Sequence, residues 1–282
     1  MKQFSLVLFL VLLCACSVSS KLLKNNKSKE SEKNSINYLK VERQGNLTVS
    51  DIGSSAMSTW ICATNGTILK SSATAVKFIL TSKIDGKCKQ VDVDHDGLPW
   101  VINDKGAVYR LSRIVGDSLV WNKVYTPKKK LLAIDIGCGQ FKGTPCYIAV
   151  AGSANPYIFN GNKFVINKSY DAKSKIMRLD VGNGRNGDEI TVINENGHVL
   201  QLTSDKKQVS VGMSGNDVTI GHNNDMYVSN DYGIFYKSKC SKFFTQANEL
   251  LGTKLSVGNT LWAVGADKYV YNATISADLN GC

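Results

Sequence analysis

Several residue types are scarce in this chain, and their scarcity excludes several classes of protein. The 282 residues include only 4 prolines and 3 histidines. No long stretch repeats apolar residues with the 3.6-residue period of an amphipathic helix, which excludes a helical bundle. The 24 glycines stand largely in Asn-Gly, Asp-Gly and Asp-Tyr-Gly turns, which are typical of short strands joined by tight turns. We therefore expect an all-β protein.

Motifs for catalysis and metal binding are missing as well. The chain has no G-x-S-x-G elbow, no H-E-x-x-H helix and no glycine-rich phosphate loop. It also has no Cys-x-x-Cys or His-x-x-x-His pair for zinc. The three histidines, His95, His198 and His222, are expected in or beside turns on opposite rims, where they cannot converge. We predict no catalytic residue, no metal, no cofactor and no enzymatic activity.

One stretch does resemble the start of a calcium loop. Asp92, Asp94, Asp96 and Gly97 follow the order D-x-D-x-D-G, but the twelfth position holds Asn103 instead of a bidentate glutamate. Trp100 stands where a ligand is needed, and no flanking helices are expected. We interpret this stretch as a strand and turn of a repeat.

The N-terminal sequence is typical of a secreted protein. We expect a signal peptide over residues 1–20, with an apolar run from Phe4 to Ala15 that is too short to span a bilayer. We expect residues 21–36 to be a flexible charged leader and residues 37–282 to form the folded domain. A bacterial lipoprotein signal at Leu13–Cys16 is the alternative, but five candidate N-glycosylation sites favour a eukaryotic secretory route: Asn26, Asn46, Asn65, Asn167 and Asn272.

Cysteine usage agrees with secretion. The predicted signal peptide contains two of the eight cysteines, and the remaining even number predicts disulfides: Cys62, Cys88, Cys138, Cys146, Cys240 and Cys282. Cys138 and Cys146 flank a short glycine-rich turn, so we expect them to bridge a hairpin. Cys240 is a plausible partner for the terminal Cys282, and the sequence leaves the other pairings open.

The net charge of +11 comes mostly from lysine. Lysine is a hydrated point charge that is poorly suited to bidentate recognition of phosphates or bases, and secretion also argues against nucleic acid. An anionic cell surface is a better partner for this charge, and a lysine-rich surface that only keeps the chain soluble is the alternative.

The strongest signal is an internal repeat. Each copy has a strand that ends in a small or acidic residue, an aromatic strand, a turn and a third strand. The first strands end about 40 residues apart, as propeller blades do, at Gly53, Asp94, Gly137, Gly182, Gly221 and Gly258. The sixth copy lacks a fourth strand, and residues 38–41 can supply it. The repeat therefore predicts a six-bladed β-propeller closed by an N-terminal strand.

The repeat resembles the tectonin repeat over residues 45–275, most fully from Asp92 to Arg110. Copies three to five depart from it because they lack the tryptophan, and copy six has Lys268 where glycine stands. The resemblance implies a six-bladed propeller related to fish-egg lectins. It also implies that the chain binds glycans or lipopolysaccharide in recognition or innate immunity.

We expect the recurrent aromatics, Trp60, Trp100, Tyr227 and Trp262, to fill the core between blades instead of stacking on sugars. The candidate carbohydrate-binding residues lie in turns between second and third strands: Asn103, Asp104, Lys105, Asn194, Glu195, Asn196, Asn230 and Asp231. The predicted function is a secreted lectin whose partners are glycans, lipopolysaccharide or cell-surface and matrix glycoproteins. The alternative is an extracellular protein-binding scaffold with no sugar ligand.

Overall fold

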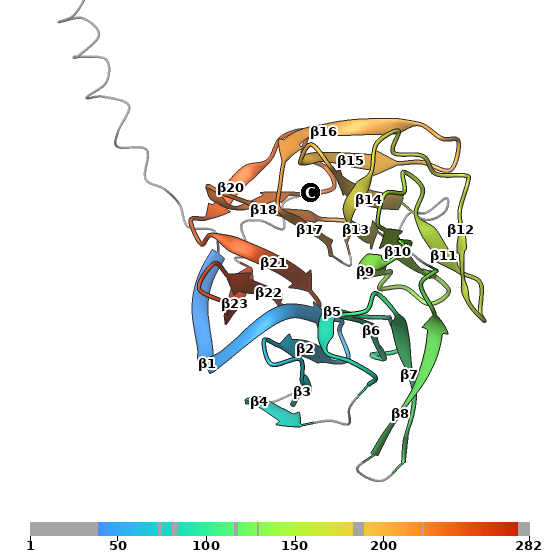
Figure 1. The fold of residues 1–282 in the computed structure, drawn as a ribbon. Coiled ribbons are helices and arrows are strands. Elements are labelled where there is room, and N and C mark those ends of the chain that lie inside the picture. Colours follow the sequence, from blue (N-terminus) through green and yellow to red (C-terminus); the bar gives the residue numbers. More distant parts are fainter. Residues whose placement is uncertain are drawn as a thin grey trace, which may run out of the picture. The chain divides into compact units, whose positions relative to one another are not determined.

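The computed structural model describes residues 39–72, 75–80, 84–115, 118–128, 130–182, 189–221 and 223–275 (Figure 1). The predicted signal peptide and leader, Asn26, His222 and Cys282 lie outside these residues. Within the described part of the chain, no helix is long and apolar enough to cross a membrane.

The described residues form a β-propeller, which confirms the predicted fold class. Its sheets are arranged around a common centre (Figure 1).

Four sheets have four strands each. The first comprises β5 (Cys88–Val93), β6 (Pro99–Asn103), β7 (Val108–Val115) and β8 (Ser118–Tyr125). The second comprises β9 (Ala133–Cys138), β10 (Cys146–Val150), β11 (Tyr157–Phe159) and β12 (Phe164–Ile166). The third comprises β13 (Ile176–Gly182), β14 (Glu189–Asn194), β15 (His198–Leu202) and β16 (Gln208–Ser214). The fourth comprises β17 (Asp217–Ile220), β18 (Met226–Asn230), β19 (Gly233–Lys237) and β20 (Thr245–Asn248).

The fifth sheet has seven strands in the order β21-β22-β23-β1-β2-β3-β4. These strands are β21 (Gly252–Val257), β22 (Leu261–Gly265), β23 (Tyr269–Ile275), β1 (Leu39–Ser54), β2 (Thr59–Ala63), β3 (Ile68–Ser72) and β4 (Ala75–Leu80). Counted as sheets, the propeller has five blades, so the prediction of six separate blades is not confirmed. The reason is that β1 is one long strand that joins the first and last copies of the repeat.

The predicted closure by an N-terminal strand is present. The first part of β1 pairs antiparallel with β23, with Leu39 opposite Ile275 and Val41 opposite Ala273. The register then shifts between Arg43 and Thr48, and the second part of β1 pairs with β2. β1 and β23 therefore belong to one sheet, which leaves no unpaired edge at this junction.

The second strand of each blade is buried on both faces because neighbouring sheets cover it. All five residues of β6 are buried, as are all five of β2, β10 and β22. The predicted core aromatics are confirmed as core, with exposed fractions of 1% for Trp60, 2% for Trp100, 2% for Tyr227 and 7% for Trp262. These rings are therefore not available for stacking on a sugar.

Small residues at the ends of the first strands let neighbouring blades approach each other. A Cβ atom on Gly53 would lie 2.6 Å from the Cα atom of Asp92, and one on Gly137 would lie 2.7 Å from that of Asp180. The turn glycines have a different role, because Gly106 has a φ of 71°. Lys268 has a φ of 66° at the equivalent turn, which a residue with a side chain rarely adopts.

The predicted hairpin disulfide is confirmed, since Cys138 on β9 is bonded to Cys146 on β10. A second disulfide joins Cys62 on β2 to Cys88 on β5 and so links two neighbouring sheets, a pairing that the sequence left open. Cys240 is also disulfide-bonded.

Candidate functional site

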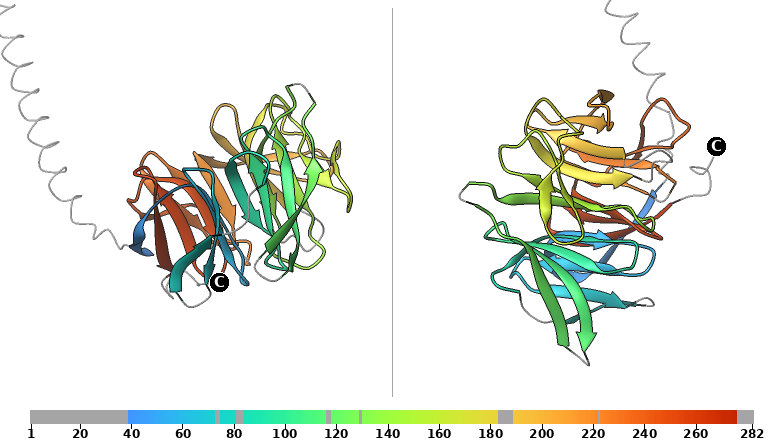
Figure 2. Two further views of the ribbon diagram at one scale, coloured as in Figure 1. Left: turned by 60° about the horizontal axis from the view of Figure 1, so that its bottom comes forward. Right: turned by 90° about the vertical axis from the view of Figure 1, so that its right-hand side faces the viewer.

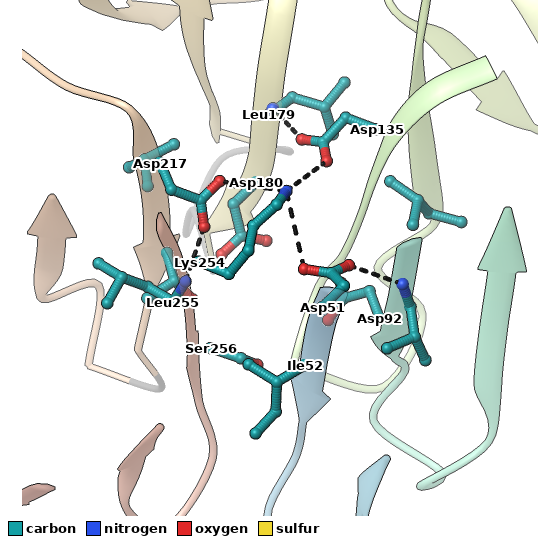
Figure 3. A pocket seen from close by; sticks show the side chains of 14 residues that line it. Asp51, Ile52, Asp92, Asp135, Leu179, Asp180, Asp217, Lys254, Leu255 and Ser256 are labelled. Atoms are coloured by element: carbon teal, nitrogen blue, oxygen red, sulfur yellow. Dashed lines mark hydrogen bonds and ion pairs between the residues drawn. The ribbon is translucent and has the colours of Figure 1, made fainter. Parts of the chain in front are cut away.

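The centre of the propeller is a buried cluster of charged side chains on the first strands of the repeats. Its acids are Asp51 on β1, Asp92 on β5, Asp135 on β9, Asp180 on β13 and Asp217 on β17. Figure 3 shows Lys254 of β21 among these acids. We call these six residues the axial cluster.

Each acid of the axial cluster binds the first strand of the next repeat. Its Oδ2 atom accepts a hydrogen bond from a backbone amide, and in the sixth repeat the hydroxyl of Ser256 does the same. The pairs of acceptor and donor are Asp51 and Val91 (2.7 Å), Asp92 and Cys138 (2.6 Å), Asp135 and Leu179 (2.8 Å), Asp180 and Ile220 (2.7 Å), Asp217 and Leu255 (2.7 Å), and Ser256 and Ser54 (2.7 Å). The bonds form a closed ring around the axis. The cluster therefore holds neighbouring first strands together.

Lys254 compensates part of the buried negative charge. Its Nζ atom lies 3.7 Å from Asp51, 3.6 Å from Asp135 and 3.7 Å from Asp217, and it donates a 2.9 Å hydrogen bond to Oε1 of Gln90. Only 7% of the Lys254 residue is exposed. Nearby acids favour its charged form and raise the pKa of Lys254 despite its burial. One buried ammonium group therefore forms ion pairs with three carboxylates on three strands.

Burial raises the pKa of Asp51, Asp92, Asp180 and Asp217 and so favours their neutral forms. Desolvation raises the pKa of Asp51 to about 7, although Lys254 acts in the opposite direction. Desolvation also raises the pKa of Asp180 to about 7, and burial together with the nearby Asp180 raises the pKa of Asp92 well above its ordinary value. Asp51 and Asp180 therefore titrate near neutral pH, which ties the stability of the propeller to pH.

The axial cluster offers little room for a ligand. The cavity beside it has a volume of about 30 Å³, enough for one or two water molecules. No group of His, Cys, Asp or Glu side chains in the described parts of the chain is arranged to hold a metal ion. The arrangement is suited to joining strands at the axis.

A larger pocket lies between the β5–β8 sheet and the β9–β12 sheet. Its volume is about 250 Å³, slightly below the usual range of small-molecule pockets. The lining residues are Lys89, Gln90, Ile102, Asn103, Asp104, Gly106, Leu132, Ala133 and Ile134. We call this cavity the inter-blade pocket. Its mixture of apolar wall and a few polar groups is typical of a small-molecule site.

Gln90 connects the inter-blade pocket to the axis. Its Oε1 atom accepts the hydrogen bond from Lys254, and no hydrogen bond of its Nε2 atom is found among the described residues. A cation on the oxygen side polarises the amide, so the nitrogen becomes a better donor. Gln90 therefore lines the pocket with an amide whose oxygen is already bound by Lys254.

The predicted asparagines have internal hydrogen-bond partners. Oδ1 of Asn103 accepts from the amides of Lys105 (3.1 Å) and Ala107 (2.8 Å), and its Nδ2 donates to the carbonyl of Asp85. Such an Asx turn fixes the backbone of the hairpin. Asn103 is 2% exposed, so it shapes the pocket wall more than it offers free groups.

The equivalent asparagines in two other sheets repeat this arrangement. Asn194 accepts from the amides of Asn196 and His198 and donates to the Ser174 hydroxyl at 3.1 Å. Asn230 accepts from the Tyr232 amide and donates to the carbonyl of Ser214 at the end of β16. These asparagines fasten each turn to the chain that enters the same blade.

The charged residues of the same turns are exposed but partly engaged. Lys105 is paired with Asp85 at 2.8 Å, and Glu195 with Lys175 at 2.5 Å. Asp231 accepts a 2.9 Å hydrogen bond from Asn216. Asp104 accepts a 3.1 Å hydrogen bond from the Lys87 amide.

The eight predicted binding residues lie in turns of three different sheets and do not form one site. Of the eight, the inter-blade pocket is lined by two, Asn103 and Asp104. Lys89, Gln90 and Leu132 were not predicted, because no motif marks residues that meet only when two blades pack. The axial acids were not predicted either, although the sequence Asp-Ile-Gly or Asp-Val-Gly recurs at Asp51, Asp135 and Asp180 and could have indicated them.

The acids of the D-x-D-x-D stretch turn to separate partners. Asp92 belongs to the axial cluster, and Asp96 lies 2.9 Å from His95. Oδ2 of Asp94 accepts a 2.9 Å hydrogen bond from Nε1 of Trp100, and its Oδ1 accepts from backbone amides of its own turn. Asp94 therefore anchors the core tryptophan of its blade.

The fold and its central ring define the chain as a β-propeller protein. Comparisons with solved structures agree at the level of fold. A streptogramin B lyase matches with a TM-score of 0.57 and 11% identity over 84% of this chain and 98% of the other. U3-55K matches with a TM-score of 0.55 and 11% identity over 82% and 79%, and YCF48 bound to D1 peptide with 0.54 and 10% over 81% and 78%. No family model and no curated protein matches the sequence.

Proposed function

We propose that this protein is a secreted, non-catalytic lectin of the tectonin-repeat type, which binds glycans or lipopolysaccharide. The inter-blade pocket carries the proposal. Its lining includes the acidic Asp104, the amide-bearing Gln90 and the basic Lys89 beside the apolar Leu132. Sugars offer hydroxyl groups and apolar ring faces, which such a lining complements. Weak binding at one pocket would gain from avidity on a surface with many copies of the glycan.

The proposal includes a six-bladed architecture in which the seven-stranded sheet acts as two blades that share β1. A hydrophobic cluster within this sheet supports this interpretation, because it joins Ile52 and Ile61 of β1 and β2 to Trp262 and Val264 of β22. Residues of one flat sheet cannot pack face to face, so the sheet must bend between its halves. The bond from Ser54 to Ser256 also joins β1 to β21 across this junction.

The disulfides support the secretory part of the proposal. Cysteine pairs such as Cys62–Cys88 and Cys138–Cys146 form and persist mainly in oxidising compartments. A lectin of cell or microbial surfaces would work in the same environment.

A glycan array that includes lipopolysaccharides tests the proposal. The purified mature chain should give saturable binding, and Asp104→Ala should weaken it several-fold because the pocket loses an acceptor. Asp231→Ala is the matched control, since Asp231 occupies the equivalent turn of the β17–β20 sheet, away from the pocket. Equal losses in the two variants would contradict a site at the inter-blade pocket. Absence of binding to every glycan would refute the lectin.

A protein-binding scaffold is the second candidate, and the β7–β8 hairpin favours it. This hairpin extends beyond the neighbouring strands (Figure 2). Near its end, Ile114 and Val115 are 54% and 55% exposed, although both are apolar. Exposed apolar side chains at a protruding strand pair are suited to a protein partner. A scaffold would leave the glycan array empty and lose its partner in an Ile114→Ser variant.

A further inference from the structure

Two N-glycosylation sequons lie in exposed turns with the same local geometry. Asn65 stands in the turn between β2 and β3, and its Oδ1 atom accepts a 2.9 Å hydrogen bond from the amide of Thr67. Asn167 follows β12, and its Oδ1 atom accepts a 3.0 Å bond from the amide of Ser169. In both cases the acceptor and the donor are the first and third residues of the sequon. Both sequons therefore form an Asx turn on the surface.

This geometry leaves the reactive atoms of both sequons free. Asn65 is exposed and Asn167 is half-exposed, and no hydrogen bond of either Nδ2 atom is found among the described residues. The hydroxyls of Thr67 and Ser169 likewise have no partner in the described part of the chain. A bulky sugar on either nitrogen would extend into solvent without disturbing a strand.

The same two sequons share one end of the propeller. The four strands of each repeat, β1–β4 included, form an antiparallel meander, so the turn after the second strand and the connection after the fourth strand lie at the same end of the strands. Asn65 lies in such a turn and Asn167 in such a connection. Gly66 beside Asn65 contacts Lys87, whose backbone binds Asp104. A glycan on Asn65 would therefore stand near the inter-blade pocket.

The sequon at Asn272 has an opposite arrangement. Asn272 lies within β23, between Trp262 of β22 and Glu42 of β1. Residues directly opposite each other point to the same face of a sheet, and Trp262 packs into the cluster between β22–β23 and β1–β3. Asn272 is half-buried on this face of a paired strand, so a glycan on it would lie against the packed layer instead of extending from a turn.

Asn46 shows a third arrangement. Its Oδ1 atom accepts a 3.0 Å bond from Arg43, and the hydroxyl of Thr48, the third residue of its sequon, is 2.9 Å from that of Thr64. The Asx turn of the other two sequons is not formed here.

We propose that Asn65 and Asn167 carry N-linked glycans and that Asn272 does not. The donor would be a polyprenyl-diphosphate-linked oligosaccharide in the secretory pathway. The Nδ2 atom forms a bond to the anomeric carbon and loses a proton, while the bond from that carbon to the diphosphate oxygen breaks and the lipid diphosphate leaves with the electron pair. The proposal shares only the secretory route with the proposed lectin function, and it does not depend on sugar binding.

Site mapping on the full chain tests this proposal. The chain is expressed in eukaryotic cells, collected from the medium and treated with a peptide N-glycosidase in ¹⁸O-water, which marks each formerly glycosylated asparagine as ¹⁸O-labelled aspartate. Peptide mass spectrometry should find the label at Asn65 and Asn167 and should find Asn272 unchanged. Label at Asn272, or its absence from Asn65 and Asn167, overturns the proposal.

Single variants provide an independent readout. Asn65→Gln and Asn167→Gln should each remove one glycosidase-sensitive step in gel mobility, and the matched control Asn272→Gln should remove none. A chain that stays in the cytosol overturns the proposal as well, because the donor is not available there. A glycosylated chain that binds no glycan would instead count against the lectin alone.

Discussion

Replacing Lys254 with methionine should destabilise the propeller strongly at alkaline pH. The substitution keeps a long side chain but removes the buried ammonium that lies within 3.7 Å of Asp51, Asp135 and Asp217. Removing one partner of a buried ion pair costs about 3–5 kcal/mol because the remaining charge is left uncompensated. For a chain of this size, each kcal/mol lowers the melting temperature by about 2–4 °C. We therefore expect the melting temperature at pH 8 to fall by roughly 10 °C.

The pH dependence of this effect follows from the carboxyl pKa values. The pKa of Asp51 is about 7 in the folded chain against an ordinary value of 3.8, and Asp180 behaves alike. The folded state therefore binds these protons more tightly than the unfolded state. Stability rises as the pH falls from about 7 toward 4, and it reaches a lower plateau above pH 7. The parent chain should thus be more stable at pH 5 than at pH 8.

The variant should show this dependence more steeply. Without Lys254, the pKa of the Asp51 carboxyl rises further, so protonation at pH 5 recovers more of the lost stability. Thermal unfolding at pH 5 and pH 8 measures both effects, with Lys207→Met as the control. Lys207 is also paired with an acid but has a side chain that is 77% exposed. If Lys254→Met at pH 8 unfolds no earlier than Lys207→Met, the axial cluster does not hold the ring together.

Three further outcomes are expected. Deleting residues 21–44 should destabilise or aggregate the chain because β23 loses its pairing with the first part of β1 and becomes a sheet edge. Deleting residues 21–35 should leave thermal unfolding and size-exclusion profiles unchanged, and equal behaviour of the two deletions would exclude closure by β1. Replacing both Cys62 and Cys88 with alanine should lower the free energy of unfolding by roughly 3–4 kcal/mol, because the bridge closes a loop with a sequence separation of 26. Denaturant unfolding measures this change, and an unchanged midpoint would refute the prediction. A calcium chelator should leave the melting temperature unchanged, since hydrogen-bond donors of the protein already bind both carboxylate oxygens of Asp94. A fall in the melting temperature that calcium reverses would instead show a metal site.

The sequence by itself determined the strands and the type of fold. Each copy of the repeat has local features: alternating apolar residues, an aromatic residue in the second strand and a turn glycine such as Gly106. These features predicted the propeller and the burial of Trp100 from the sequence alone. The short spacing of Cys138 and Cys146 also fixed their hairpin disulfide. Closure by residues just before the first copy followed from the missing strand of the last copy.

The tertiary structure alone decided how the repeats join and where a pocket lies. The join of the first and last copies into one sheet depends on the bend of β1, which strand periodicity does not encode. The inter-blade pocket needs Gln90 and Leu132 from different sheets to meet, and their distance in space is set by blade packing. Asn103 lies in a turn, as the sequence predicted. Its side-chain amide, however, is already hydrogen-bonded to the backbone and is not available to a ligand. Patterns within a strand therefore predict the blade, whereas contacts between blades determine the site.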